Sequence, residues 1–261
     1  NIITDYYDDG IEADSGGLNI RVWGNTTATN VSCGVGGNTG VSLAPCLSGP
    51  CYLFRNYLTT NLGVGVKGGN NALGYAFWFH NTIKATRAGG GGYHAIGQAG
   101  GTAYSQNHRW YNNIFYTVQD NIHEREGPRS GNDYDYNVAF CTVSCTAVAL
   151  WNNTTNYTTW ADYVTATGMD DFGGSQVSGV FGDPVFDGAN HIGSASNAHD
   201  AGVSLDNFNT SDSCWPAVAA PDIGAFEVSN NWLANCTTPA SPGNVVPRRI
   251  LRTPGDDDQG F

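Results

Sequence analysis

Charge and long apolar stretches are both scarce in this chain of 261 residues. Charged side chains make up 13% of it, about half of what an ordinary globular protein carries. There are 11 lysines and arginines against 23 aspartates and glutamates, so the formal net charge is −12, and a surface of that sign repels the phosphates of nucleic acid. No apolar run approaches the roughly 18 residues of a membrane-spanning helix. These absences argue against a nucleic-acid partner and against a membrane span.

Zinc-finger and phosphate-loop motifs are also missing. No cysteines have zinc-finger spacing together with histidines. The glycine-rich run AGGGG at 88–92 is followed by neither GKS nor GKT. The chain has instead 35 glycines, 13 tyrosines and one methionine, which indicates a turn-rich β protein with few long helices.

Seven cysteines indicate an oxidising compartment. We therefore expect a secreted protein, extracellular or at the cell surface, and the abrupt start in NIITDYYDDG is compatible with a missing leader or a longer N-terminal part. Because seven is an odd number, one thiol is expected to be free. The expected local pairs are Cys141–Cys145 and Cys214–Cys236, and the pairing of Cys33, Cys46 and Cys51 stays open.

Short β-rich runs end in asparagine five times. The closing asparagines are 31, 25, 32 and 24 residues apart, and a second apolar-then-polar segment precedes each by 13 to 14 residues. Two strands and two turns per unit of about 25 residues are typical of stacked coils. Asparagine suits such a turn because it tolerates the left-handed conformation, and stacked amides hydrogen-bond from coil to coil. The predicted ladder consists of Asn25, Asn56, Asn81, Asn113 and Asn137.

These repeats resemble the right-handed parallel β-helix proteins of the pectate-lyase-like superfamily. The resemblance rests on DDGIEADSGGLNIRVWGN, GVSLAPCLSGPCYLFRN, YAFWFHNTI and RWYNNIF, and on HDAG with APDIGAFE, which is similar to the C-terminal element of many secreted bacterial β-helices. It implies an all-β parallel β-helix (a solenoid) over residues 1–228, with clear coils in 5–140 and a helix and closing coils in 141–228. Residues 229–261 are expected to be an irregular, Pro-rich tail that can supply a strand to a neighbouring subunit.

One short helix is expected in TTWADYVTATGMD. Thr158 or Thr159 suits its N-cap and Gly168 its C-cap.

An acidic cluster opens the first unit, and stacking the units places it at one end of a polar strip. We expect Glu12 and Asp14 to point outward, with Ile11 and Ala13 inward. The oxygens of Asp9, Glu12 and Asp14 suit Ca²⁺, the one cofactor that the sequence suggests. The first column of the strip is predicted to hold Glu12, Ser42, Lys67, Gln98 and His123, and the second to run from Asp14 to Arg125.

The resemblance implies one chemistry for this strip, because related enzymes cleave acidic polysaccharides by β-elimination at a Ca²⁺ site. Lys67 would then be the base, with His123 or Arg125 neutralising the substrate carboxylate. Stacking puts Lys67 roughly 10 Å from Glu12. A glycoside hydrolase would instead need two carboxylates about 5 to 9.5 Å apart, a condition that neighbours among these acids could meet. Solvated turn residues account for the same acids without any chemistry.

Other side chains have simpler interpretations. His80 and His108 share no offset within the units and are expected to face solvent. Aromatic residues alternate within the strands, so some belong to the core and the outward ones are candidate platforms for sugar rings. The examples are Trp23, Phe54, Trp78 and Trp110.

Seven Asn-x-Ser/Thr sequons occur, three of them within WNNTTNYTTW. Asn25 is also a ladder residue and cannot carry a glycan if its side chain points inward. The candidate glycosylation sites are therefore Asn30, Asn152, Asn153, Asn156, Asn209 and Asn235.

Two functions fit these observations. One is an extracellular structural or surface glycoprotein that assembles with itself end to end into a filament, which the small number of coils and the uncapped first coil favour. The other is a polysaccharide lyase or glycoside hydrolase, or a carbohydrate-binding remnant of one. The expected partners are accordingly further copies of the chain or a polysaccharide.

Overall fold

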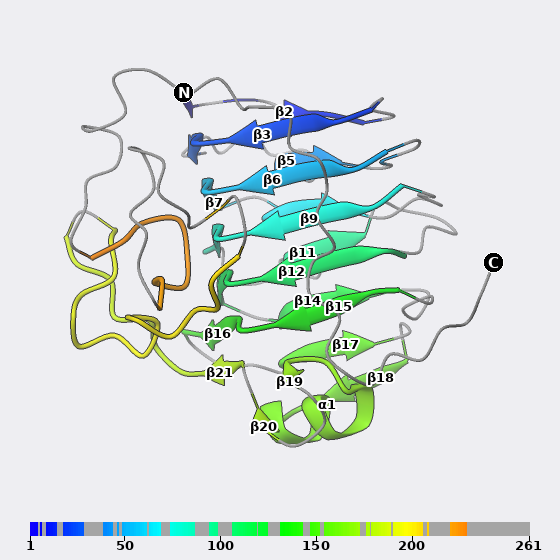
Figure 1. Cartoon of the computed structure of the whole chain (residues 1–261), viewed down its shortest axis with the longest axis vertical. Coiled ribbons are helices and arrows are strands. Elements are labelled where there is room, and N and C mark those ends of the chain that lie inside the picture. The colour runs from blue at the N-terminus through cyan, green and yellow to red at the C-terminus, as the bar shows by residue number, and fades with distance from the viewer. Residues whose placement is uncertain are drawn as a thin grey trace.

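About half of the described chain is β-strand, arranged mainly in parallel sheets (Figure 1). The structure is a computed structural model. It describes residues 1–4, 6, 9–14, 18–28, 39–43, 46, 49–61, 63–68, 74–86, 94–98, 106–118, 120–124, 131–142, 147–151, 154–172, 176–177, 179–188, 190–205, 208 and 220–228.

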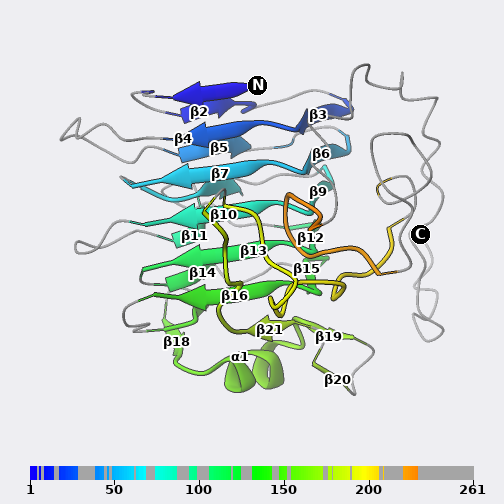
Figure 2. The ribbon, with the colours of Figure 1, turned by 90° about the vertical axis from the view of Figure 1, so that its left-hand side faces the viewer.

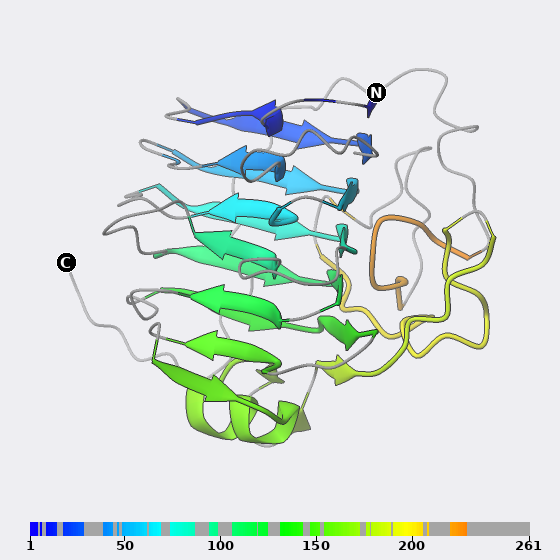
Figure 3. The ribbon, with the colours of Figure 1, turned by 180° about the vertical axis from the view of Figure 1, so that it is seen from behind.

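Three sheets contain nearly all the strands of the described residues. The first is β1 (Ile2–Thr4), β4 (Thr26–Ala28), β7 (Tyr57–Thr60), β10 (Thr82–Ala85), β13 (Ile114–Thr117), β16 (Val138–Cys141) and β21 (Val180–Phe181). The second, seen from behind in Figure 3, is β2 (Asp9–Glu12), β5 (Thr39–Leu43), β8 (Val66–Gly68), β11 (His94–Gln98), β14 (Asp120–Glu124), β17 (Ala149–Trp151) and the antiparallel β18 (Thr155–Tyr157). The third is β3 (Ile20–Trp23), β6 (Cys51–Phe54), β9 (Ala76–Phe79), β12 (His108–Tyr111) and β15 (Asp133–Asp135).

The chain visits the three sheets in turn, and we call one such passage a coil. Each strand pairs in parallel with the strands of the coils before and after it, for example β9 with β6 and β12. The pairing keeps equivalent residues of successive coils in register. The interior is therefore built from columns of like side chains.

Apolar side chains fill the space between the sheets. In the third sheet the inward column stacks the rings of Trp78 and Trp110, whose centroids are 4.3 Å apart. Full burial of a large apolar side chain is worth about 1.5–3 kcal/mol, so these columns are the main source of stability. The inward columns are Thr27, Leu58, Ile83, Phe115 and Ala139 (first sheet), Ile11, Val41, Val66, Ile96, Ile122 and Ala149 (second), and Val22, Leu53, Trp78, Trp110 and Tyr134 (third).

The five predicted asparagines lie at the corner between the third and first sheets and form one continuous ladder. In each step the backbone N–H and Nδ2 of one asparagine both donate to Oδ1 of the next, as from Asn56 to Asn81 at 3.1 and 2.9 Å. Nδ2 also donates to a strand carbonyl, for example from Asn81 to Leu53. The ladder extends beyond these five, to Asn1 at one end and to Asp170 at the other.

The left-handed conformation occurs one residue earlier than the sequence indicated. The residues that precede the five asparagines all have positive φ, whereas the asparagines do not. The preceding residue makes the sharp turn, which leaves the asparagine free to direct its amide into the ladder. The left-handed residues are Gly24, Arg55, His80, Asn112 and Tyr136.

A helix closes one end of the stack, where α1 (Trp160–Thr167) lies below β17 and β18 in Figure 1. Thr159 is its N-cap and accepts a hydrogen bond from the Asp162 N–H, and Gly168 ends it with φ 68°. Both caps are as predicted. Trp160, Tyr163 and Val164 of α1 join the apolar core. The short hairpin of β19 (Asp171–Phe172) and β20 (Gln176–Val177) follows the helix.

The described residues from 182 to 228, called the C-terminal segment, cover the outer face of the first sheet (Figure 2). Ile192, Ala198 and Ile223 form a second apolar cluster with Ile114 and Val138 of that sheet. Close approach explains the glycine of APDIGAFE: Gly224 has φ 109°, and a Cβ there would lie 2.7 Å from Ile114.

The same segment buries the corner formed by the left-handed residues. Arg55 forms an ion pair with Glu227, and the amide of Asn112 exchanges two hydrogen bonds with the backbone of Val203. His80 Nδ1 lies 3.1 Å from the Asp222 carbonyl oxygen and its Nε2 lies 3.0 Å from Asn112 Nδ2, the arrangement of a neutral imidazole that donates at Nδ1 and accepts at Nε2.

The expectation that His80 and His108 face solvent is wrong. Both are buried, His80 by the C-terminal segment and His108 in the core beside Trp78 and Trp110. Among the described residues, no helix is long and apolar enough to cross a membrane.

Candidate functional site

Aromatic side chains line the outer surface of the third sheet. Because side chains alternate along a strand, the residues two and four positions before each ladder asparagine point outward while the one between them points inward. In-register pairing then places the outward rings of neighbouring strands one above another. We call this surface the aromatic face; it consists of Trp23, Tyr52, Phe54, Tyr75, Phe77, Phe79 and Tyr111.

Several rings of this face are close to parallel. Tyr52 and Phe77 have centroids 5.1 Å apart and planes 14° apart, and Phe77 and Tyr75 have centroids 6.1 Å and planes 13° apart. Tyr75 is 50% exposed, so this edge of the aromatic face is open to solvent. Burial raises the pKa of Tyr52, an effect that the Arg21 cation opposes; the phenol therefore stays protonated at neutral pH.

Charged groups border the rings. The Arg21 guanidinium lies 5.7 Å from the centre of the Tyr52 ring, and Arg109 Nη1 lies 3.8 Å from an Asp133 carboxylate oxygen. The Tyr111 hydroxyl donates to the same carboxylate. Burial and the Asp133 charge raise the pKa of Tyr111. Beside the apolar rings there is thus a partly exposed set of hydrogen-bond donors and acceptors.

Part of the aromatic face is covered by the C-terminal segment. Phe208 packs against Phe54 and Phe79, with centroids 5.1 and 4.9 Å apart in edge-to-face geometry, and against Tyr52. The rings at Tyr75 and Phe77, with Arg109 and Asp133 beside them, have no such cover in the described part of the chain.

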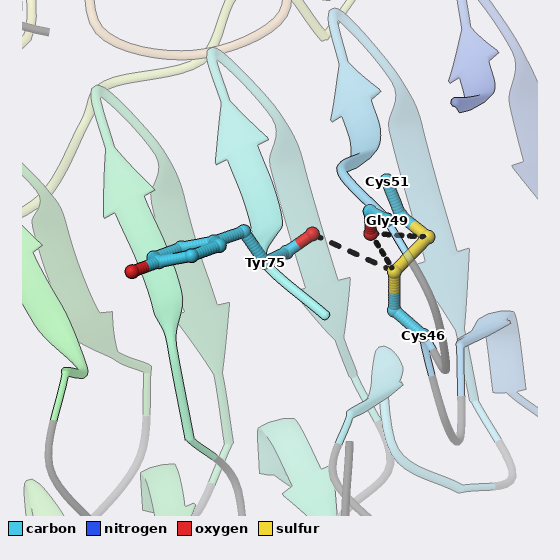
Figure 4. Close-up of a disulfide and its surroundings, with 4 residues drawn as sticks. All are labelled: Cys46, Gly49, Cys51 and Tyr75. Atoms are coloured by element: carbon cyan, nitrogen blue, oxygen red, sulfur yellow. Dashed lines mark hydrogen bonds between the residues drawn. A yellow bond between two sulfur atoms is a disulfide. The ribbon is translucent and has the colours of Figure 1, made fainter. Parts of the chain in front are cut away.

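A disulfide braces the backbone next to the exposed ring (Figure 4). Cys46 and Cys51 are bonded to each other, and the Cys51 N–H donates to the Tyr75 carbonyl at 2.8 Å. In Figure 4 the Tyr75 ring points away from the two sulfur atoms. The disulfide therefore fixes the strand edge that carries Tyr75 without contacting the ring.

The predicted polar strip on the second sheet contains an internal ion pair. Lys67 Nζ donates to both carboxylate oxygens of Asp9, at 2.8 and 3.0 Å, and Asp9 is 5% exposed. An ammonium group has no electron pair with which to accept a proton, and this one is held by a carboxylate. The arrangement joins the proposed base to a proposed Ca²⁺ ligand.

The other predicted residues of the strip are separate from that pair. Glu12 is exposed, and the exposed Asp14 accepts a hydrogen bond from Ser42 at 2.6 Å. Ile11 and Ala13 pack against the core as predicted. Gly97, and not Gln98, occupies the column of Lys67. His123 belongs to β14, but its side chain, like the whole of Arg125, lies outside the described residues.

The remaining cysteines and the sequons are described only in part. Cys141 is disulfide-bonded. Asn156 is exposed, whereas Asn25 is buried in the ladder, as its inward position requires. Outside the described residues lie Cys33, Cys145, Cys214 and Cys236 and the sequon asparagines Asn30, Asn152, Asn153, Asn209 and Asn235.

Most of the aromatic face was missed in the sequence, although a signal was present. The alternation left open which of Trp23, Phe54, Trp78 and Trp110 face outward, but counting back from each ladder asparagine assigns Trp78 and Trp110 to the core. The same count assigns Tyr52, Phe77, Arg109 and Asp133 to the surface.

Comparison of the chain with protein-family models, with curated proteins and with solved structures gives no match.

Proposed function

We propose that this chain is a secreted right-handed parallel β-helix that binds a polysaccharide on its aromatic face. The observation that carries the proposal is the set of outward rings on the third sheet: a row along the stack (Trp23, Phe54, Phe79 and Tyr111), the stacked pair of Tyr52 and Phe77 beside it, and Tyr75 half exposed at its edge. Aromatic rings offer large, rigid apolar surfaces, which suit the C–H faces of sugar rings. Parallel strands repeat about every 4.8 Å, so the row suits a ligand that itself repeats.

Hydrogen bonding at this face fits sugar hydroxyls. Arg109 donates, Asp133 accepts, and a pair at 3.8 Å in partial contact with solvent is loose enough to exchange its partner for a hydroxyl. Ligand sites of this kind combine apolar walls with a few placed polar groups.

A neutral polysaccharide is the better substrate class. The chain has a formal charge of −12, which repels an anionic polymer at long range. The ion pair of Lys67 with Asp9 also gives no support to a lyase base on the second sheet. Two disulfide-bonded sites, Cys46–Cys51 and Cys141, support an oxidising, extracellular location.

Affinity electrophoresis tests the proposal. The whole chain is run through gels that contain neutral polysaccharides (a β-glucan, a mannan and a xylan) or anionic polygalacturonate. We expect one neutral polymer to retard the wild type, Tyr75→Ala to remove most of the retardation, and Phe181→Ala, an exposed ring elsewhere, to leave it unchanged. Retardation by none of the neutral polymers, or equal retardation of both variants, would contradict the proposal.

A second candidate function is self-association through the first coil. Within the described residues, β1, β2 and β3 each pair with a strand on one side only, and Ile2 and Leu18 are 80% and 74% exposed. Free strand edges pair readily with other strands. Because α1 covers the opposite end, pairing of two first coils is favoured over a head-to-tail filament. Multi-angle light scattering of the wild type and Ile2→Lys distinguishes a dimer, which the variant would weaken, from a monomer.

A further inference from the structure

A histidine and two aspartates converge in the C-terminal segment. His199 Nδ1 lies 3.3 Å from Asp200 Oδ2. One ligand atom from each of His199, Asp200 and Asp222 lies within 4.8 Å of the other two. Asp222 belongs to the PDIGAFE stretch, so two separate parts of the chain supply this cluster.

Backbone hydrogen bonds hold Asp222 in place. Its Oδ1 accepts from the Asp200 N–H at 2.8 Å and its Oδ2 accepts from the Val228 N–H. Asp222 is 3% exposed. Each carboxylate oxygen has a second lone pair, so these bonds orient the group without using up its capacity to bind an ion.

The two other members face solvent. The side chains of His199 and Asp200 are 31% and 64% exposed, so an ion can reach the cluster and both side chains can adjust to it. The cluster thus combines one fixed ligand with two mobile ones.

The local charge favours a cation. Arg55 is paired with Glu227, and no lysine or arginine of the described chain forms an ion pair with Asp200 or Asp222. Two neighbouring carboxylates therefore lack a positive partner in this part of the protein. A divalent cation between them would remove the repulsion.

We propose that His199, Asp200 and Asp222 bind a divalent transition-metal ion of the Zn²⁺ class. Zinc binds imidazole nitrogen and carboxylate oxygen at about 2.0–2.2 Å in tetrahedral geometry, which puts two ligand atoms about 3.3 Å apart, the separation of the His199 and Asp200 atoms. The separations to the Asp222 atom are at most 4.8 Å; small rotations of the partly exposed His199 and Asp200 side chains would shorten them, and water would complete the site. Calcium is disfavoured because it takes oxygen ligands.

Such an ion would tie the turn at residues 199–200 to the stretch that buries the left-handed corner. Asp222 contacts His80 through its carbonyl and Glu227 through its N–H, and Glu227 contacts Arg55. Metal binding would therefore stabilise the whole C-terminal segment on the first sheet. The inference does not depend on the proposed sugar binding.

Titration calorimetry with ZnCl₂ tests the site, using the whole chain purified without a histidine tag, treated with EDTA and alkylated to block any free thiol. We expect one Zn²⁺ per chain and a higher melting temperature with metal. His199→Gln and Asp200→Asn should each weaken binding at least tenfold, whereas Asp183→Asn, which changes another exposed carboxylate of the C-terminal segment and keeps its acceptor oxygen, should bind as the wild type does. CaCl₂ should give no saturable heat at the same concentrations.

Two results would overturn the proposal. One is the absence of saturable Zn²⁺ binding by the folded wild type. The other is unchanged binding in both His199→Gln and Asp200→Asn, which circular dichroism would show to be folded. Asp222 is left unchanged because its loss would also break two backbone contacts.

Discussion

Arg55, at the end of the second coil, and Glu227, in the C-terminal segment, form a buried ion pair in which Nη2 lies 2.5 Å from Oε1. Burial raises the pKa of Glu227, an effect that the Arg55 charge opposes. The pair fastens the C-terminal segment to the corner of the stack.

Glu227→Gln should therefore destabilise the protein strongly. The substitution removes the carboxylate charge that faces the buried Arg55 guanidinium, and breaking one side of a buried pair costs about 3–5 kcal/mol. We expect a clearly lower urea midpoint in equilibrium unfolding. Glu12→Gln is the matched control, and an equal midpoint shift in both variants would show that the ion pair contributes nothing specific.

Loss of one central ladder residue should also be costly. Asn81→Ala removes the acceptor of two Asn56 hydrogens and the donor to Leu53 and Asn113. Each buried polar group left unpaired costs about 1–3 kcal/mol, so the free energy of unfolding should fall by several kcal/mol. The exposed Asn156→Ala should change it by less than about 0.5 kcal/mol. Equal effects in denaturant titrations would contradict a stabilising ladder.

The ladder and α1 could be predicted because each is a local signal. Asparagines at a constant offset from the preceding segment predicted the repeating coil. A threonine and a glycine predicted the first and last residues of the helix. The position of the left-handed residue could not be predicted, because Arg55 and Tyr136 are of types with no preference for positive φ, so the five positions share no common residue signal. Gln98 was assigned one position too far because long glycine-rich loops separate the units.

Contacts between distant parts of the chain were beyond the sequence pattern. His80 is buried because residues 222 and 203 return to its corner, and nothing near His80 in the sequence indicates that. Likewise, the Lys67 side chain extends beyond its own column to contact Asp9. Strand register does not predict this contact, because it depends on the length of the lysine side chain and on the local charge.

Asp170, the last residue of the ladder, should make the free energy of unfolding fall as pH rises. Burial raises the pKa of Asp170 to about 8 from 3.8, with hydrogen bonds from Asn137 opposing the shift. The folded state then holds a proton that the unfolded chain has lost, so this contribution is full below about pH 3.8 and is lost as pH rises through 8. Asp170→Asn keeps the acceptor oxygen and should remove the corresponding slope in the free energy of unfolding between pH 6.5 and 8. A wild-type slope that persists in the variant would refute this role.

His108 should give the free energy of unfolding the opposite pH dependence, so that it falls as pH falls. Burial lowers its pKa to about 4 from 6.5, and neither ring nitrogen has a hydrogen-bond partner among the described residues, so the imidazole is neutral in the fold. The unfolded chain takes up the proton first, and stability is therefore full above pH 6.5 and lost as pH falls toward 4. The difference in unfolding free energy between His108→Leu and the wild type should grow by about 1.4 kcal/mol per pH unit across that range. A difference independent of pH would contradict a neutral, buried His108.

The most direct test of the account is the affinity of the aromatic face for the neutral polysaccharide that retards the protein most. Titration calorimetry with a soluble oligosaccharide of that polymer compares the wild type, Tyr75→Ala and Phe181→Ala. Loss of an aromatic contact worth about 1.4 kcal/mol is a tenfold loss of affinity. The account predicts roughly that loss for Tyr75→Ala and none for Phe181→Ala. Wild-type affinity in Tyr75→Ala, with the fold intact, would show that the aromatic face is not the binding site.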